Sequence, residues 1–524
     1  MKRLTSSVYT FDSLITGEYL YVDKTEYIWN LIEQPKGIYF MSRPRRFGKS
    51  LTISTLEAVF RGRKELFRGL AIYDKPYDWK PYPVIHLDMN NGEYSTPELT
   101  LHSLANMVTR AAKELGVSIG TDTPGQMFLD LITALGEHDQ VVILVDEYDK
   151  PLLNNIGKPH AQEILAILKT FYSKIKAADR MERFVFITGV SKFSHVSIFS
   201  DLNNLFDVTM DPDYATMMGY TQREFEANFA EHIDAAVATL KLPREEFLAE
   251  MKKWYDGYRF EQGAETVYTP VSVANFFISD FRFKNYWFST GTPTFLLDYC
   301  RENLFDFEKI LTEPVSEIAF EAYEVDRINP LALLLQTGYL TIKDSFVQNF
   351  RTYYYLKFPN GEVQWAFEMY LLTAYTGQTS EDLTSIVFSL IRNLGSGNVD
   401  EVMKRMQSFF AAIPYDIQVR NEKYYQTIFF SLFYLLGIDI EAESRTSDGR
   451  IDATASVGDW RFLFEFKLDG SPEIALDQIM AKEYFRKFLG SGKRLMVVGA
   501  NFDFETRRLA DWKSMEITRQ DRER

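Results

Sequence analysis

The chain has 524 residues, of which 46% are hydrophobic and 25% charged, so it is too long for one core and too apolar for a disordered chain. Its net charge of −15 argues against a broad surface that coats nucleic acid, although residues 1–70 hold 12 basic against 7 acidic residues. A single cysteine, Cys300, excludes an internal disulfide, and no apolar run reaches the length of a membrane span. We expect a cytoplasmic protein of several domains without a membrane partner.

The first predicted elements are a strand-like segment at 19–25, a helix after it, a buried strand at 37–41 and a helix at 51–60. The last two flank the segment Ser-Arg-Pro-Arg-Arg-Phe-Gly-Lys-Ser at 42–50. A strand, a tight loop ending in Gly-Lys-Ser and a helix are typical of a phosphate-binding loop, whose amides face the phosphates of ATP. The residues expected to bind ATP are Arg46, Phe47, Gly48, Lys49 and Ser50.

Two of these residues have a specific expected role. Lys49 reaches the β- and γ-phosphates, and the Ser50 hydroxyl is a ligand of Mg²⁺. The first glycine of the usual pattern is absent, because Arg43 takes its place. Arg43, Arg45 and Arg46 either extend the positive charge of the loop or lie on a solvated surface.

The second half of the nucleotide site is expected after a strand at 84–88 and helices near 97–115 and 126–136. The apolar run 141–145 ends in Asp146 and Glu147, as expected for a buried parallel strand whose carboxyl end meets a ligand. Asp146 would hold Mg²⁺ through water and bind the nucleotide, and Glu147 would act as the general base. The alternative is that both acids cap a loop after an ordinary strand.

A third strand, predicted at 183–189, ends at Thr188, where ATPases with an additional strand place a sensor of the γ-phosphate. Thr188 or Ser191 could take this role, and the alternative for each is an ordinary hydroxyl at a strand end. Strands that alternate with helices predict a parallel, doubly wound sheet over residues 1–211.

The middle region, 212–410, is predicted to be a helical or winged-helix lid followed by a helical connector. Many ATPases of this class complete their site with an arginine from a neighbouring subunit. Arg183, Arg223 and Arg259 are candidates, so a homo-oligomer is a further expectation. His86 and His195 are interpreted as structural.

The C-terminal region, 411–524, shows a second pattern of charged residues. A strand at 449–455 and its hairpin partner at 460–467 bring Asp452 beside Glu465, and Lys467 shares the face of Glu465 because residues two apart on a strand do so. Two carboxylates and a lysine favour a site for Mg²⁺ or Mn²⁺ that cleaves phosphodiester bonds, with Asp452 and Glu465 as ligands. The alternative is a solvated face of an edge hairpin.

The order of predicted elements supports this interpretation. A helix at 422–436, a strand at 439–443, the hairpin, a helix at 472–489 and a strand at 495–499 give the core of a restriction-endonuclease-like α/β fold. Glu422 and Gln478 lie where that fold often adds polar groups, and Tyr425 is interpreted equally well as a core residue.

These segments together resemble a bacterial and archaeal family of AAA-ATPase-like proteins with a C-terminal PD-(D/E)XK nuclease-like domain. The resemblance rests on segments from Tyr-Val-Asp-Lys-Thr at 21–25 and the loop at 43–50 to Val-Asp-Glu-Tyr-Asp-Lys-Pro at 145–151 and Tyr-Tyr-Gln at 424–426. It implies an ATP-binding module coupled to a nuclease-like module. Ile451 replaces the proline that often precedes the first acid of the nuclease signature.

Two functions are compatible with these patterns. One is an ATP-dependent nuclease acting on DNA or RNA through Asp452, Glu465 and Lys467. The other is a nucleotide-dependent switch whose nuclease-like domain binds nucleic acid or a protein without cleavage, which the acidic net charge favours.

Overall fold

The computed structural model describes residues 1–192, 199, 202, 204–287, 313–317, 320, 330–414, 428–429, 431–433, 435, 439–446, 449–468, 470–503, 505–506 and 508–517. The chain divides into two compact units. The N-terminal unit comprises Met1–Gly291 and Thr312–Val363, and the C-terminal unit comprises Thr292–Leu311 and Gln364–Arg524. The predicted division into three domains at 211 and 410 stays a prediction.

A parallel sheet of five strands, in the order β2-β3-β4-β1-β5, forms the centre of the N-terminal unit. Its strands are β1 (Gly37–Ser42), β2 (Val84–Asp88), β3 (Val141–Asp146), β4 (Glu182–Gly189) and β5 (Phe206–Asp207). Every residue of β3 and β4 is buried, which agrees with the apolar run in β3 and in the middle of β4. Because β4 lies between β1 and β3, the strand of the phosphate loop and the strand of the two acids are not neighbours.

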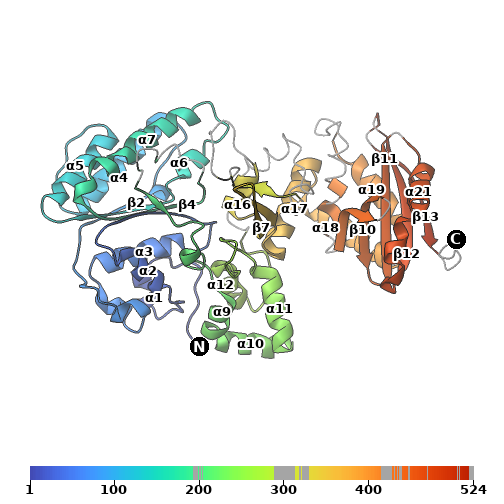
Figure 1. Cartoon of the computed structure of the whole chain (residues 1–524), viewed down its shortest axis with the longest axis horizontal. Coiled ribbons are helices and arrows are strands. Elements are labelled where there is room, and N and C mark those ends of the chain that lie inside the picture. Colours follow the sequence, from blue (N-terminus) through green and yellow to red (C-terminus); the bar gives the residue numbers. More distant parts are fainter. Residues whose placement is uncertain are drawn as a thin grey trace. The chain divides into compact units, whose positions relative to one another are not determined.

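Helices cover both faces of this sheet, with α4, α5 and α7 on one side and α1 to α3 on the other (Figure 1). Their bounds are α1 Phe11–Thr16, α2 Thr25–Ile32, α3 Lys49–Phe60, α4 Pro97–Glu114, α5 Pro124–Gly136, α6 Lys150–Leu153 and α7 Ala161–Ala177. Thr96 and Thr123 cap α4 and α5, and the proline after each threonine occupies the first helical position, where its missing N–H costs nothing.

The strand expected at 19–25 is wrong. Only Tyr19 forms an isolated bridge, to Arg3, and α2 already begins at Thr25. Asp23 explains the change, because its Oδ1 accepts hydrogen bonds from the backbone N and the hydroxyl of Thr25 and so favours the start of a helix.

The rest of the N-terminal unit is partly helical, as expected for a lid, but it also contains a small antiparallel sheet in the order β6-β8-β7. The region predicted to be a helical connector therefore contains strands. The elements are α9 Gln222–Asn228, α10 Ala230–Leu240, α11 Arg244–Tyr255, α12 Pro270–Ile278, β6 Val315–Ser316, α16 Pro330–Thr337, β7 Thr341–Gln348 and β8 Arg351–Lys357.

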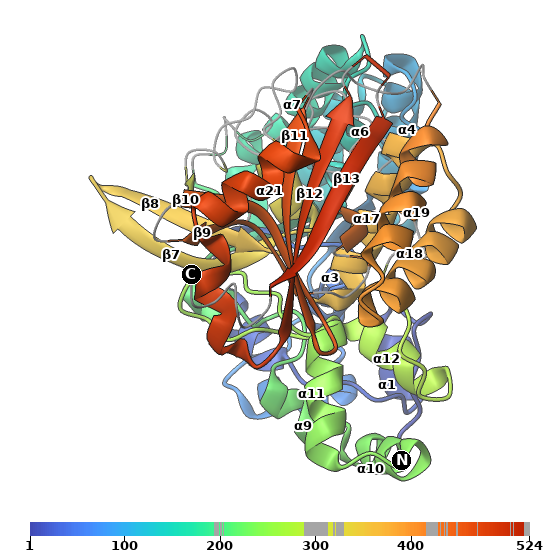
Figure 2. The same ribbon diagram turned by 90° about the vertical axis from the view of Figure 1, so that its right-hand side faces the viewer.

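The C-terminal unit contains a mixed sheet in the order β13-β12-β11-β10-β9, in which only β11 and β12 are parallel. Helix α21 lies against one face, and α18 and α19 lie on the other side (Figure 2). The bounds are α17 Gly361–Thr376, α18 Ser380–Gly395, α19 Val399–Ala411, β9 Asp439–Thr446, β10 Gly449–Val457, β11 Trp460–Leu468, α21 Pro472–Ala481, β12 Arg494–Asp503 and β13 Arg508–Ile517. Strand β13 was not expected from the sequence.

No helix among the described residues combines the length and the apolar character needed to cross a membrane.

Candidate functional site

The phosphate loop leaves the carboxyl end of β1 and enters α3 through a left-handed backbone. Gly48 has φ 96°, a conformation that side chains rarely adopt, while a Cβ there would meet nothing within 4 Å. Arg46 is also left-handed, with φ 68°. The glycine of Gly-Lys-Ser is therefore required by backbone conformation and not by lack of space.

The first turn of α3 offers its amides to a ligand. The helix begins at Lys49, and among the described residues no side chain caps it, since its N-cap residue is Gly48. Free amides and the positive end of the helix dipole attract anions, so the loop fits the phosphates of a nucleotide.

Lys49 lies at the centre of the site and is almost fully buried. Its Nζ is 3.2 Å from Glu147 Oε1 and donates to the carbonyl oxygens of Arg43 (3.1 Å) and Pro44 (3.2 Å). The lysine and the acid expected to serve ATP binding and hydrolysis are thus direct neighbours, although 98 positions separate them in the sequence.

Asp146 fits a divalent cation. It hydrogen-bonds Ser50, and burial together with the charge of Glu147 raises the pKa of Asp146 to about 6. Its Oδ1 is buried and has no hydrogen-bond partner among the described residues. A buried carboxylate oxygen without a partner costs free energy unless a cation or water satisfies it, so Ser50 and Asp146 have the chemistry expected of Mg²⁺ ligands.

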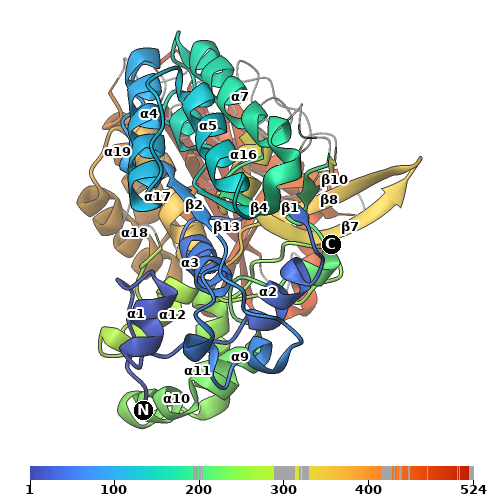
Figure 3. The same cartoon turned by 90° about the vertical axis from the view of Figure 1, so that its left-hand side faces the viewer.

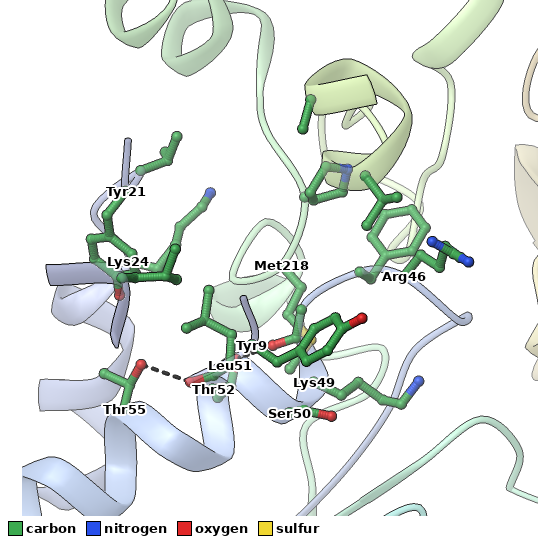
Figure 4. A pocket seen from close by; sticks show the side chains of 18 of the residues that line it. Tyr9, Tyr21, Lys24, Arg46, Lys49, Ser50, Leu51, Thr52, Thr55 and Met218 are labelled. Carbon is green, nitrogen blue, oxygen red and sulfur yellow. Dashed lines mark hydrogen bonds between the residues drawn. The ribbon is translucent and has the colours of Figure 1, made fainter. Parts of the chain in front are cut away.

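A pocket of about 360 Å³ continues from the phosphate loop (Figure 4). It is lined by Arg46, Lys49 and Ser50 and by a larger set of side chains that are mostly apolar. These come from the N-terminal segment, the start of α2, the turn before α9, and α12, and include Val8, Tyr9, Leu20, Ile28, Met217, Met218, Val271 and Ala274. The pocket thus joins an anion site to a surface suited to a flat, largely apolar ring.

Lys24 fixes two walls of this pocket to each other. Its Nζ donates to both Glu224 carboxylate oxygens and to the carbonyl of Thr216, each at 2.7 Å. Burial lowers the pKa of Lys24, although Glu224 opposes the shift. These walls were not predicted from the sequence, in which the Tyr-Val-Asp-Lys-Thr segment at 21–25 is the signal that points to them.

Arg43 does neither of the things expected of it. Its guanidinium is 1% exposed and donates to the carbonyls of Ser42 (3.0 Å), Thr209 (2.7 Å) and Tyr214 (3.0 Å). It also lies 4.2 Å from the centre of the Phe260 ring. The residue in place of the first glycine anchors the loop to the segment that follows β5.

The two hydroxyls proposed as γ-phosphate sensors already bind within the protein. Thr188 Oγ1 is buried and donates to the carbonyl of Met41 at 2.7 Å, and Ser191 Oγ donates to Asp149 Oδ2. Asp149 was not expected: it is fully buried, accepts the amides of Val190 (3.2 Å) and Ser191 (2.7 Å), and so joins the loop after β3 to the end of β4. Burial raises the pKa of Asp149.

Two of the three candidate arginines form hydrogen bonds within the N-terminal unit. Arg183 is buried and donates to the carbonyls of Ile32 and Gln34, and Arg259 donates to the carbonyl of Lys343. Arg223 is exposed on α9. An arginine supplied by a second copy stays a prediction that rests on the sequence.

The structural interpretation of His86 agrees with its surroundings. Its Nδ1 lies 3.1 Å from Glu57 Oε2. Burial acts to lower the pKa of His86, but the hydrogen bond and charge of Glu57 raise it. His195 lies outside the described residues.

In the C-terminal unit, the register of β10 and β11 brings the predicted acids together. Ala453 faces Phe464, so Asp452 lies beside Glu465, and Asp452 Oδ2 accepts the amide of Phe466 at 2.7 Å. Lys467 Nζ lies 3.0 Å from Glu465 Oε1.

Gln478 on α21 completes this cluster. Its Oε1 accepts from Lys467 Nζ at 2.7 Å, and its Nε2 donates to Glu465 Oε1. The amide therefore holds the lysine and the acid in a fixed relation. Glu422 and Tyr425 lie outside the described residues.

Glu465 has the features of a metal ligand. It is 2% exposed, its Oε2 has no hydrogen-bond partner in the part of the chain that the structure describes, and burial together with the charge of Asp452 raises the pKa of Glu465 to about 7. A divalent cation held by Asp452 and Glu465 would satisfy that oxygen and remove the repulsion between the acids. Within the described ranges, no group of three or more His, Cys, Asp or Glu side chains forms a larger site.

Comparison with known proteins gives a family match for each of the two regions that contain these sites. A family model described as predicted AAA-ATPase matches residues 6–199, and one described as PD-(D/E)XK nuclease superfamily matches residues 420–512. The chain is also 36% identical over 522 residues to a protein of Azotobacter chroococcum mcd 1 named "Uncharacterized protein in vnfD 5'region", with 97% of each chain covered.

Proposed function

Because this chain belongs to the family of predicted AAA-ATPases with a PD-(D/E)XK nuclease-like domain, we propose that it hydrolyses ATP and cleaves nucleic acid under the control of the nucleotide. The ATP site would be the phosphate loop, and the cleavage site would be the cluster on β10, β11 and α21.

One observation carries the nuclease part of the proposal: Glu465, buried beside Asp452, has an oxygen without a partner among the described residues, while its other oxygen contacts Lys467 and Gln478. If the two acids had only a structural role, each of their buried oxygens should accept a hydrogen bond or form an ion pair within the protein. An unsatisfied oxygen beside a second acid and a lysine is instead suited to a catalytic metal.

Each group in the cluster has a role in this proposal. Asp452 and Glu465 hold the metal, and Mg²⁺ or Mn²⁺, when bound, supplies positive charge and a reactive water. Lys467, fixed by Gln478, orients the attacking water or stabilises the negative charge that develops on the phosphate.

The ATP part rests on the loop and its neighbours. The amides at the start of α3 and Lys49 bind the phosphates, and Ser50 and Asp146 hold Mg²⁺. Glu147 accepts the proton of the attacking water. The apolar side chains of the pocket receive the base, which favours a nucleotide over inorganic phosphate.

Thr188 is an unsuitable sensor as long as its hydroxyl donates to Met41. The hydroxyl retains its lone pairs, so any role for Thr188 in ATP binding would be as an acceptor. We propose instead that the Asp149–Ser191 contact couples the position of Glu147 to the end of β4. Asp149 lies two residues after Glu147, so a change at Glu147 on nucleotide binding would reach Ser191 through Asp149.

Cleavage of linear and circular DNA and of RNA tests the proposal, in Mg²⁺ or Mn²⁺, with and without ATP. Wild type should cleave, Lys467→Ala and Glu465→Gln should not, and the exposed-lysine control Lys482→Ala should behave as wild type. Lys49→Ala should lose the effect of ATP.

The outcomes separate the two functions. Cleavage that survives Lys467→Ala would come from another source and would contradict the nuclease site. No cleavage by wild type, together with ATP binding lost in Lys49→Ala, would favour a nucleotide-dependent switch that binds its partner without cutting.

A further inference from the structure

The hairpin of β7 and β8 projects from the N-terminal unit as a two-stranded ribbon (Figures 2 and 3). Its strands are joined by Asn349 and Phe350. Neither proposed catalytic site uses it.

On one face of this ribbon, aromatic rings lie between two cations. Along β8, residues two apart share a face, which places Arg351, Tyr353, Tyr355 and Lys357 together. The register adds Phe346 opposite Tyr353 and Asp344 opposite Tyr355. The rings of Phe346 and Tyr353 are stacked, with centroids 5.3 Å apart and planes at 12°, and Tyr355 lies 5.8 Å from Phe346.

The opposite face is the one that packs against the protein. It carries the buried residues Ile342 and Leu356, and Tyr354 contacts Phe320 with ring centroids 5.7 Å apart. The hairpin is therefore held in place without burying the aromatic face, and Phe346, Tyr353 and Tyr355 stay half-buried.

The tip of the hairpin has a backbone conformation and an exposed side chain that do not stabilise the fold. Asn349 and Phe350 both have positive φ, 52° and 60°, and Phe350 is fully exposed. Two-residue turns of this kind prefer glycine at the second position, so phenylalanine costs about 1 kcal/mol of strain there. Val347, beside it, is 69% exposed. A strained, exposed aromatic residue suggests a binding role.

Positive charge is concentrated at the hairpin in a chain that is acidic overall. Residues 341–357 include Lys343, Arg351 and Lys357 but only one acid, Asp344. Arg259 Nη1 donates to the carbonyl of Lys343, which brings a further cation to the base of the hairpin. Burial, together with the charges of Arg259 and Lys343, lowers the pKa of Lys357, although Asp256 opposes the shift.

We propose that this face of the β7–β8 hairpin binds single-stranded nucleic acid. Bases stack on Phe346, Tyr353 and Tyr355, and Arg351 and Lys357 bind the phosphates on either side of the stacked bases. A duplex hides the faces of its bases, so the aromatic residues favour a single strand. The inference deepens the proposed function and rests on it in one respect, that the substrate is a nucleic acid.

Fluorescence anisotropy with labelled single-stranded DNA and RNA tests the inference, in EDTA and on a Lys467→Ala background so that cleavage cannot interfere. The double variant Phe346→Ala/Tyr353→Ala should bind tenfold or more weakly, because stacking contributes roughly that factor per base. Tyr353→Phe keeps the ring and should bind as the parent does. Phe388→Ala, an exposed aromatic on α18, is the matched control and should have no effect.

Salt dependence gives a second, independent readout. Arg351→Gln should reduce the slope of log K against log salt concentration by about 0.7, the value for one contact with a single strand. ATP binding by every variant checks that the N-terminal unit is folded.

Affinity unchanged in the double variant would overturn the inference, as would no binding by the parent or a preference for duplex. Unchanged affinity for nucleic acid in the double variant is also the result expected if the hairpin binds a protein instead. Loss of binding in the double variant supports the inference even if the wild type cleaves nothing, so failure of the nuclease proposal is a separate result.

Discussion

Arg43 shows how one residue changes the meaning of a familiar motif. The pattern of a phosphate loop asks for glycine at this position, and the sequence alone suggests that an arginine there faces the phosphates or the solvent. In the structure its side chain is buried and binds three carbonyls, two of them from the segment that follows β5. The loop is therefore supported by a neighbouring segment as well as by its own backbone.

Replacement of Arg43 by lysine should destabilise the N-terminal unit by about 2–4 kcal/mol. A lysine has a single nitrogen and cannot reach carbonyls on both sides, so buried acceptors lose their donors. Thermal unfolding would measure the change, with the exposed Arg68→Lys as the control. Equal melting temperatures for Arg43→Lys and wild type would contradict the anchoring role.

Glu182, the first residue of β4, is a second buried charge that affects stability. Both of its carboxylate oxygens lack hydrogen-bond partners among the described residues, and burial raises its pKa from 4.5 to about 8. Between these pH values the folded chain holds a proton that the unfolded chain has released, so stability falls as pH rises from 4.5 to 8.

Glu182→Gln should remove this loss. Relative to wild type, the variant should gain stability progressively between pH 4.5 and 8, by about 4 kcal/mol at pH 8 when the difference at pH 4 is taken as zero. Urea unfolding at a series of pH values measures the gain, because titrations shared by both proteins cancel. A difference independent of pH would show that Glu182 is charged when folded.

At the scale of elements, the close approach of α21 to β12 positions the nuclease-like cluster. Gly499 pairs with Glu465, and a Cβ on Gly499 would lie 2.3 Å from the carbonyl of Pro472 and 2.9 Å from Ala475. Only glycine lets the helix sit at this distance, which brings Gln478 within reach of Glu465 and Lys467.

Gly499→Ala should reduce cleavage about tenfold without removing any group that touches substrate. The added methyl meets backbone, so α21 must move and carry Gln478 away from Lys467. Rates of cleavage by Gly499→Ala and Gln478→Ala should fall together, while Gly395→Ala, where a Cβ finds ordinary contacts, should retain the wild-type rate. Full activity in Gly499→Ala would mean that the position of Gln478 is unimportant.

The sequence predicted the elements of both sheets well where apolar runs were bounded by clear signals. Strands β1, β3 and β4 were predicted from a phosphate loop and two later apolar runs, and the pairing of Asp452 with Glu465 was predicted from the two-residue period of a hairpin. It missed β7 and β8, because the half-buried tyrosines of β8 resemble isolated apolar segments of a helix. It also gave no indication of Asp149, whose partners lie 41 and 42 positions away.

At the scale of the whole molecule, two compact units each have a core of their own. The N-terminal unit buries the parallel sheet, and the C-terminal unit buries the residues between its mixed sheet and α21, including Leu463, Ile479 and Val497. Separate cores predict that ligands of one unit stabilise that unit directly.

Thermal unfolding should therefore show two transitions. ATP with Mg²⁺ at a hundred times its Kd should raise the transition of the N-terminal unit by an amount equivalent to about 2.7 kcal/mol, and Lys49→Ala should abolish the shift. Mn²⁺ without nucleotide should raise the other transition, and Asp452→Asn should remove that effect. A single transition that responds to both ligands would contradict independent cores.

The contact between Lys49 and Glu147 makes the protein's own carboxylate an internal competitor for the lysine that ATP needs. When the γ-phosphate binds, Lys49 has to exchange the Glu147 carboxylate for the phosphate. Only after this exchange is Glu147 free of the lysine and able to act as the general base. The variant Glu147→Gln removes this negative charge and should therefore bind ATP more tightly than wild type, which calorimetry would measure. The same variant should fail to hydrolyse ATP because it lacks the general base. Such a variant would hold the chain in one nucleotide state, in which the cleavage reaction could be followed with the ATPase cycle stopped.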